Sequence, residues 1–157
     1  MSEKKELLIK DLVYRLFDGV KCLVEIDDTE YDEFSGKVIG FKGKSIGELY
    51  LLDMNDNHVE LYFNEKNNIS DELSDMSMEG LITINHIKPY LRPMSSMTKD
   101  ERFQFFLVSK YASLNDDNTL NYCTPDGFDW LNAHHFDYRG LIPMELAIEA
   151  NREIYNY

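Results

Sequence analysis

A chain of 157 residues, 43% of them hydrophobic and 13% aromatic, has enough apolar material for one packed domain, or for one domain with a small appendage. This composition argues against a disordered chain. The 29 acidic residues outnumber the 16 basic ones, which gives a formal net charge of −13. Proteins that bind nucleic acids or anionic membranes use clustered Lys and Arg, so we expect neither as a direct partner.

The sequence also restricts the cellular compartment. No stretch approaches the ~20 uninterrupted apolar residues that a membrane-spanning helix needs. The first residues, Met1 to Glu6, are mostly charged, unlike the apolar core of a secretory signal peptide. The two cysteines, Cys22 and Cys123, are too few for a disulfide framework or a CxxC-type zinc site. We therefore expect a protein of the reducing cytoplasm, with no cofactor and no bound metal.

Residues 3 to about 17 are predicted to form an amphipathic helix. Leu8, Leu12 and Leu16 recur at four-residue spacing, which places them on one side of a helix. Gly19 suits the left-handed position that follows many helices. A helix this short needs an apolar surface to cover.

The hydrophobic period then changes from 3.6 to 2, as expected for half-buried strands. We expect strands at residues 20–26, 36–41, 46–52 and 58–63, and one or two more within 81–84 and 87–91. The acidic stretch 27–35 is interpreted as a loop, residues 40–45 as a lysine-containing turn, and Asp53 to Asn57 as a hairpin connection.

Helical signals return near residue 98. Thr98 and Glu101 form a capping-box pattern, which predicts a helix that runs to about Ser113. The faces of this helix are marked by Phe103, Phe106, Leu107, Lys110 and Tyr111.

Two shorter helices are predicted after a loop at residues 114–127. Asp129 is expected to cap the first, which would contain Trp130 to Tyr138. Pro143 suits the first position of the second, which would end near Arg152.

A helix, five or so strands and then two or three helices are typical of an α+β fold. Gly36 and Gly40 would allow sharp bending of the second strand, and the pattern of residues 5–92 resembles small SH3-like or Sm-like barrels. We therefore predict an antiparallel SH3-like β-barrel of about five strands, with an N-terminal helix and C-terminal helices. The expected organisation is a helix-capped barrel at residues 1–94, with a helical extension at 95–157 packed on it.

Two segments resemble a known group of proteins. Ile87 to Thr98 reads IKPYLRPMSSMT, and Asp129 to Ile142 reads DWLNAHHFDYRGLI. Both resemble segments of small uncharacterised proteins of gut bacteria, their prophages and mobile elements. The resemblance covers about 26 residues and the outline of the N-terminal helix. It implies a phage or mobile-element origin and the cytoplasm of a bacterial host, and it supplies no mechanism.

The second of these segments has the densest set of chemical groups. It contains Trp130, Asn132, His134, His135, Asp137, Tyr138 and Arg139. On a helix, His134, Asp137 and Tyr138 would share one side. A metal site needs about three converging ligands, and this segment offers two at best. The alternative is structural: Trp130, His134 and Tyr138 pack the helix onto the rest, while His135 or Asp137 holds a backbone group.

The densest acidic segment is the expected loop after the first strand. It contains Asp27, Asp28, Glu30, Asp32 and Glu33. Such a run usually keeps a protein soluble. A dense carboxylate surface can also imitate the phosphates of DNA and occupy a basic groove on a partner, and electrostatic steering would speed that encounter. Both interpretations are kept.

These segments come without a recognisable catalytic motif. A Gly-x-Ser-x-Gly elbow and P-loop spacing are missing from the sequence, and neither cysteine has an activating pattern beside it. The leading hypothesis is a non-enzymatic protein-interaction module of phage or mobile-element type with an unidentified protein partner. The alternative is an acidic nucleic-acid mimic that inhibits a bacterial defence or DNA-handling protein. A third is a metal-dependent enzyme at His134, His135 and Asp137. The oligomeric state stays open.

Overall fold

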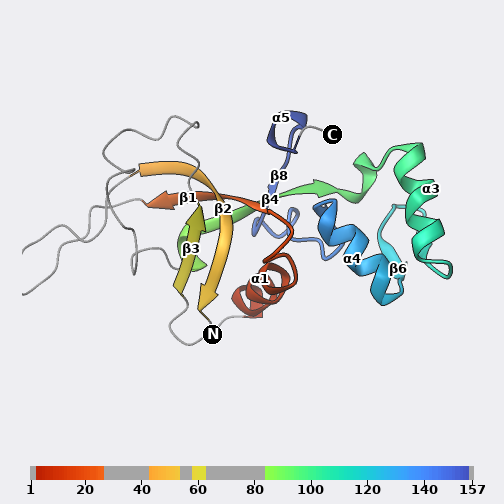
Figure 1. The fold of residues 1–157 in the computed structure, drawn as a ribbon, viewed down its shortest axis with the longest axis horizontal. Coiled ribbons are helices and arrows are strands. Elements are labelled where there is room, and N and C mark those ends of the chain that lie inside the picture. Colours follow the sequence, from red (N-terminus) through yellow and green to blue (C-terminus); the bar gives the residue numbers. More distant parts are fainter. Residues whose placement is uncertain (1–2, 27–42, 54–57, 63–83, 156–157) are drawn as a thin grey trace, which may run out of the picture. The chain divides into compact units, whose positions relative to one another are not determined.

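The computed structural model describes residues 3–26, 43–53, 58–62 and 84–155 (Figure 1). The chain divides into two compact units, Met1–Pro89 and Tyr90–Tyr157. Among the described residues, no helix has the length and apolarity needed to cross a membrane.

The first unit begins with helix α1, Glu3–Tyr14. Leu8 and Leu12 are buried, as their four-residue spacing predicts. The helix ends three residues before the expected position, in a turn that leads to Gly19. Gly19 has a φ of +67°, which confirms the left-handed conformation predicted for it.

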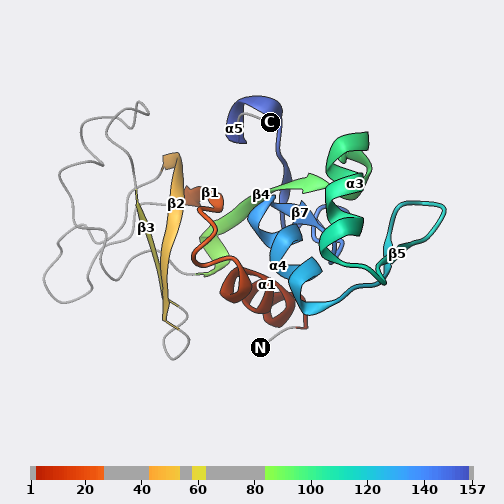
Figure 2. The same ribbon diagram turned by 45° about the vertical axis from the view of Figure 1, so that its right-hand side comes forward.

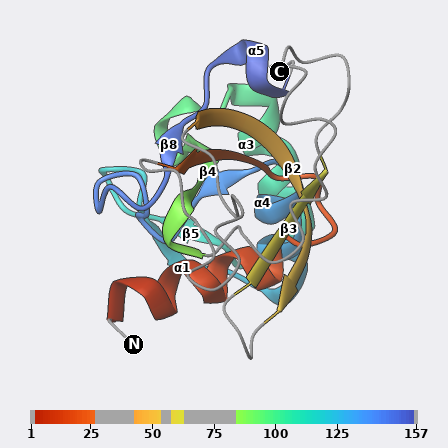
Figure 3. The same cartoon turned by 90° about the vertical axis from the view of Figure 1, so that its left-hand side faces the viewer.

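Three antiparallel strands follow α1 in the described part of the first unit. Strand β1, Lys21–Ile26, pairs along its length with β2, Gly43–Asp53, and β2 pairs with β3, His58–Tyr62. Strand β2 curves strongly along its length (Figure 3). Its register with β3 shifts between Leu49 and Leu51, which marks an irregularity of the β-bulge type.

The structure describes two of the connections that were predicted in this region, at least in part. The hairpin between the strands now called β2 and β3 is confirmed, because Asp53 is paired with His58. The turn predicted at residues 40–45 is wrong for Gly43 to Ser45, which are extended and paired with the end of β1. The predicted strand 36–41 lies outside the described residues.

The chain passes from the first unit to the second within strand β4, Ile87–Pro93. Short 3₁₀ turns, η1 at Ile84–His86 and η2 at Met94–Ser96, precede and follow it. Residues 87–89 of β4 pair antiparallel with β1. Residues 90–93 pair in parallel with two short strands, β7 at Phe136–Asp137 and β8 at Ile148–Glu149.

The predicted small antiparallel barrel is wrong for the part of the chain that the structure describes. The strands form a mixed, open sheet in the order β3-β2-β1-β4-β7, with β8 also paired to β4. Residues 90–93 of β4 pair with β7 and β8, and both of these strands lie in the region that was predicted to be helical. Strands of two residues show no period-2 pattern, so the sequence could not reveal them. The α+β class, the N-terminal helix and the presence of C-terminal helices are confirmed.

The second unit is built around helices α3, Lys99–Val108, and α4, Pro125–Ala133, which lie side by side (Figure 2). The hairpin β5–β6, Ser113–Leu114 and Leu120–Tyr122, connects them, and α5, Arg152–Tyr155, ends the unit. Its core includes a buried cluster of Met94, Phe105, Cys123, Leu131 and Phe136.

The boundaries of the C-terminal helices differ from the prediction. The capping box at Thr98 is confirmed, but α3 ends at Val108 instead of near Ser113. The helix predicted from Trp130 to Tyr138 begins earlier, at Pro125, and ends at Ala133. The helix predicted after Pro143 is wrong.

The backbone conformation explains the last of these differences. Residues 141–147 form turns that lead into β8. Within them, Glu145 has a φ of +64°, a conformation that an α-helix does not contain.

Candidate functional site

The start of α4 is fixed against the end of α3 by two hydroxyl groups. Thr124 caps α4, because its Oγ1 accepts a hydrogen bond of 3.3 Å from the Gly127 amide. Ser109 Oγ lies 2.9 Å from that Oγ1 and accepts from the Thr124 amide at 3.1 Å. A threonine followed by proline is an N-cap and N1 pattern, so the sequence contained this helix start.

Gly127 allows the two helices to come this close. A Cβ built at this position would meet the Sγ of Cys123 and would lie 2.6 Å from the Cβ of Ser109. Gly127 is buried in the first turn of α4. The residue that looks like part of a turn in the sequence is therefore a helix–helix contact point.

The end of α4 brings two aromatic rings together. The His134 ring stacks on Trp130 with ring centroids 3.8 Å apart and an interplanar angle of 20°. Its Nδ1 donates to the Trp130 carbonyl oxygen at 2.8 Å. A backbone carbonyl only accepts, so this contact requires the proton on Nδ1. Both rings are half-buried.

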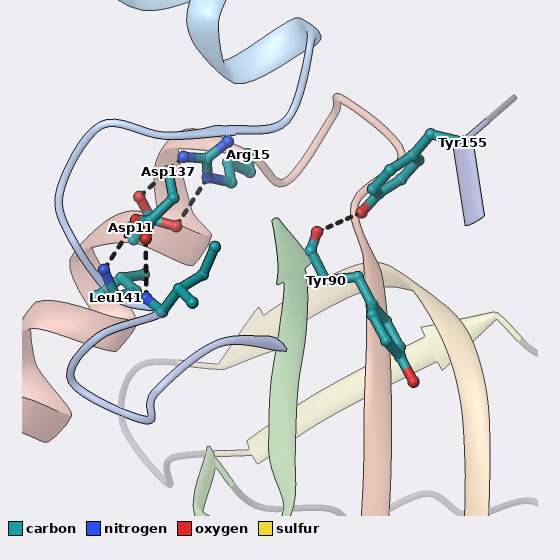
Figure 4. Close-up of polar contacts among 7 residues, drawn as sticks. Asp11, Arg15, Tyr90, Asp137, Leu141 and Tyr155 are labelled. Carbon is teal, nitrogen blue, oxygen red and sulfur yellow. Dashed lines mark hydrogen bonds and ion pairs between the residues drawn. The ribbon is translucent and has the colours of Figure 1, made fainter. Parts of the chain in front are cut away.

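His135 turns away from His134 and contacts the C-terminal helix. It has a φ of +59°, which ends the helical path of α4. Its ring stacks on Tyr155, with centroids 3.8 Å apart. The Tyr155 hydroxyl donates to the Tyr90 carbonyl oxygen at 2.7 Å, so this stack anchors α5 to β4 (Figure 4).

Asp137 holds the turn that follows it. The buried carboxylate accepts hydrogen bonds from the Leu141 amide and the Ile142 amide, each at 2.8 Å (Figure 4). The chain reverses between them at Gly140, which has a φ of +72°. The structural interpretation of Asp137, that it holds backbone groups, is confirmed.

The remaining candidates of this segment also make contacts within the second unit. The Tyr138 ring lies 5.3 Å from the Phe128 ring, centroid to centroid. The Arg139 guanidinium lies 4.9 Å from the Tyr138 ring centroid, a cation–π distance. Trp130 lies 5.6 Å from Phe105, which connects α4 to the core through the buried side of α3.

The helix face predicted for His134, Asp137 and Tyr138 is wrong, because α4 ends at Ala133. His134, His135 and Asp137 have three different sets of partners and do not converge. Over the residues that the structure describes, no three His, Cys, Asp or Glu side chains are grouped so that they could hold a metal ion.

The two cysteines are held as thiols. Burial raises the pKa of Cys22, and the nearby charge of Asp11 raises it further. Burial also raises the pKa of Cys123, against the effect of hydrogen bonds from Ser109 and Thr124. The thiolate is the nucleophilic form of cysteine, so neither residue is activated for covalent chemistry.

The acidic candidates Asp27, Asp28, Glu30, Asp32 and Glu33 lie outside the described residues. Elsewhere in the first unit, an ion pair that was not predicted joins α1 to the turn that follows it. Arg15 Nε donates to Asp11 Oδ2 at 2.7 Å, and both side chains are fully buried (Figure 4). The four-residue spacing of Asp11 and Arg15 was the available signal.

A second ion pair reinforces the capping box of α3. Arg92 makes a bidentate contact with Glu101, with N–O distances of 2.7 and 3.0 Å, and its guanidinium lies 4.3 Å from the Phe136 ring centroid. Glu101 also accepts from the Thr98 amide at 2.8 Å. Burial opposes ionisation of Glu101, but the hydrogen bonds from Arg92 and Thr98 prevail and lower its pKa to about 2.

The largest feature that the sequence analysis missed is the exposed side of α3. Phe105 is the one residue of this helix that is fully buried. Phe103 is 66% exposed and Leu107 is 59% exposed, with Phe106 beside them at 36%. The signal was present: apolar residues at 103, 105, 106, 107 and 108 surround the helix, so they cannot all face one core.

Searches for related proteins found no matching family model, no matching curated protein and no matching solved structure. The resemblance of Ile87 to Thr98 and of Asp129 to Ile142 to phage and mobile-element proteins therefore stays a prediction.

Proposed function

We propose that this chain is a non-enzymatic protein-interaction module of phage or mobile-element type, and that its partner binds the exposed side of α3. The observation that carries the proposal is the exposure of Phe103 and Leu107 on one side of a well-capped helix. Large apolar side chains grouped on a surface are typical of sites that another molecule covers.

The contrast with the rest of the second unit supports this proposal. Trp130, Phe136 and Phe105 contact one another or the core, and His135 stacks on Tyr155. The unit therefore has aromatic side chains that complete its own packing, including Phe106, whose ring centroid lies 5.4 Å from that of Phe105, whereas Phe103 on the same helix is 66% exposed. Aromatic residues on a rigid element lose little conformational entropy when a partner binds them.

The segment Trp130 to Ile142 has a supporting role in this proposal. Its polar groups hold the end of α4, the following turn and α5 in place. A catalytic group must be free to meet a substrate, whereas Asp137 already accepts two backbone amides. This segment gives α3 a rigid support.

The experiment is a capture from cells of the source, followed by reconstitution with the purified partner and calorimetry. A Phe103→Ser/Leu107→Ser double variant should lose the partner that the unaltered chain binds. The matched control is Phe17→Ser, which removes a 93% exposed apolar side chain from the first unit and should keep the partner.

Two results would contradict the proposal. Turnover of a nucleotide, peptide or glycan that is lost on His134→Ala would make the protein an enzyme. Charge reversal of Asp27, Asp28, Glu30 and Asp32 could instead abolish binding that the double variant retains. That result would favour the acidic nucleic-acid mimic.

A further inference from the structure

The exposed side of α3 combines apolar and basic residues. At about 100° per residue, Arg102, Phe106, Lys99, Phe103 and Leu107 follow one another around the helix over an arc of about 140°. We call this arc the α3 face. All five residues are exposed, and the buried Phe105 lies on the other side of the helix.

The charge of the α3 face is opposite to that of the whole chain. Lys99 and Arg102 contribute two positive charges, in a protein with a formal net charge of −13. The carboxylate of Glu101 is engaged by Arg92 on the inner side of the helix. Asp100 lies at the border of the arc, beyond Leu107. The α3 face itself therefore holds cations and no carboxylate.

We propose that the occupant of the α3 face is an acidic amphipathic helix of a partner protein. This inference rests on the proposed function and names the partner's chemistry. Apolar residues of the partner at i, i+3 or i+4, and i+7 would cover Phe103, Phe106 and Leu107. Glu or Asp at the edges of that stripe would pair with Lys99 and Arg102.

A second copy of this chain does not fit the α3 face by the same charge argument. A two-fold interface brings the same patch together from both copies. Each patch would present Lys99 and Arg102 to the like charges of the other, and like charges across an interface are unfavourable. A membrane surface fits less well, because the two cations of the α3 face are fewer than the roughly four to eight that bind anionic headgroups.

The test uses the full chain and three synthetic amphipathic helical peptides. All three peptides have the same stripe of leucines. The positions that flank this stripe are all Glu in the first peptide, all Gln in the second and all Lys in the third. At physiological salt, charges of the chain more than about 8 Å away are screened, and fluorescence anisotropy should show the Glu peptide binding about tenfold more tightly than the Lys peptide. The difference should shrink as salt is added, because exposed charges are screened.

Reversing the two positive charges of the α3 face tests whether this face causes the preference for the Glu peptide. A Lys99→Glu/Arg102→Glu variant should reverse the order and bind the Lys peptide more tightly. The control is Lys4→Glu/Lys10→Glu, which makes the same change in net charge at two exposed positions of α1 and should keep the original order. Circular dichroism confirms that each variant is folded.

Several outcomes would overturn the inference. They are equal affinity for the three peptides, no binding of any of them at about 1 mM, or an order that charge reversal does not change. Self-association that Phe103→Ser abolishes would identify a second copy as the occupant. Binding to phosphatidylcholine–phosphatidylserine vesicles that Phe103→Ser abolishes would identify a lipid surface. The cellular partner could instead still bind the Phe103→Ser/Leu107→Ser variant specifically. The protein-binding function would then stand, but the α3 face would not be its site.

Discussion

Helix α3 and the segment from Trp130 to Ile142 use similar side chains in opposite ways. The segment contains two histidines, an aspartate and an arginine, and its groups contact its own backbone or neighbouring rings. Helix α3 carries an ordinary capping box and a run of apolar residues, yet Phe103 and Leu107 remain exposed.

This difference shows why a rich set of functional groups is a weak guide to a site. Polar groups in a small unit with short helices are needed to end helices, hold turns and fix termini. Asp137 is such a group, because the amides of Leu141 and Ile142 would otherwise be unpaired in a buried turn. Apolar residues in excess of the core are the more informative signal, because exposing them is unfavourable unless something covers them.

The largest expected effect comes from the buried side of α3. Phe105→Ala should lower the free energy of unfolding of the second unit by about 4 kcal/mol, because it removes a fully buried ring and leaves a cavity beside Trp130. Trp130 is the single tryptophan of the chain, so its fluorescence during urea unfolding reports on this unit. A loss below about 1 kcal/mol would mean that α3 is not packed as described.

Asp137→Ala should have the second largest effect. It should lower the free energy of unfolding of the second unit by about 3 kcal/mol, because two backbone amides lose their hydrogen-bond acceptor. The same unfolding measurement applies. Asp137→Asn is the matched control: it keeps one carbonyl oxygen and should retain part of the lost stability. If Asp137→Ala left stability unchanged but removed an activity, the structural assignment of this residue would fail.

The ion pair of Arg92 and Glu101 predicts a pH dependence. The pKa of Glu101 is lowered to about 2 in the folded protein, against about 4.3 in an unfolded chain. Between these values the unfolded state binds more protons at Glu101, so the contribution of this residue to stability falls as the pH falls through this window and is constant above it. Glu101→Gln should be less stable at neutral pH, and its stability should fall less steeply through this window.

The measurement is the urea midpoint from pH 6 to pH 2, for the unaltered chain and for Glu101→Gln. Asp100→Asn provides the control, since it removes the neighbouring, exposed carboxylate. This variant should retain more of the slope than Glu101→Gln does. Identical slopes for the unaltered chain and Glu101→Gln would show that Arg92 does not hold the Glu101 carboxylate in solution.

The local signals of the sequence predicted much of this fold. The helix near residue 3, the strands at 20–26 and 58–63 and the capping box at Thr98 all depend on neighbouring residues, and the structure contains them, with shifted ends. The pairing of β4 with β7 and β8 joins residues more than 40 positions apart through strands of two residues. Such contacts leave no periodicity in the sequence, so the strand pattern alone does not distinguish this open sheet from a barrel.

The same limit applies to the candidate site. The prediction of one helix from Trp130 to Tyr138 depends on placing Thr124 and Pro125 in a loop, whereas they begin α4. Shifting that start by five residues ends the helix at Ala133 and separates His134 from His135. The sequence shows that α3 has more apolar residues than one core can cover. It does not show which of them face the core, because that depends on the packing of Phe105 against Trp130.

The smallest expected effect is on the exposed side of α3. Phe103→Ala/Leu107→Ala should change the free energy of unfolding by no more than about 0.5 kcal/mol, because both side chains are more than half exposed and alanine favours the helix. Partner binding should nevertheless be lost. Phe105→Ala, two residues from Phe103, should have the opposite effect: it should lower the stability of the unit although Phe103 and Leu107 themselves are unchanged. If the exposed pair cost as much stability as Phe105, these side chains would belong to the core, and no partner would be needed to explain them.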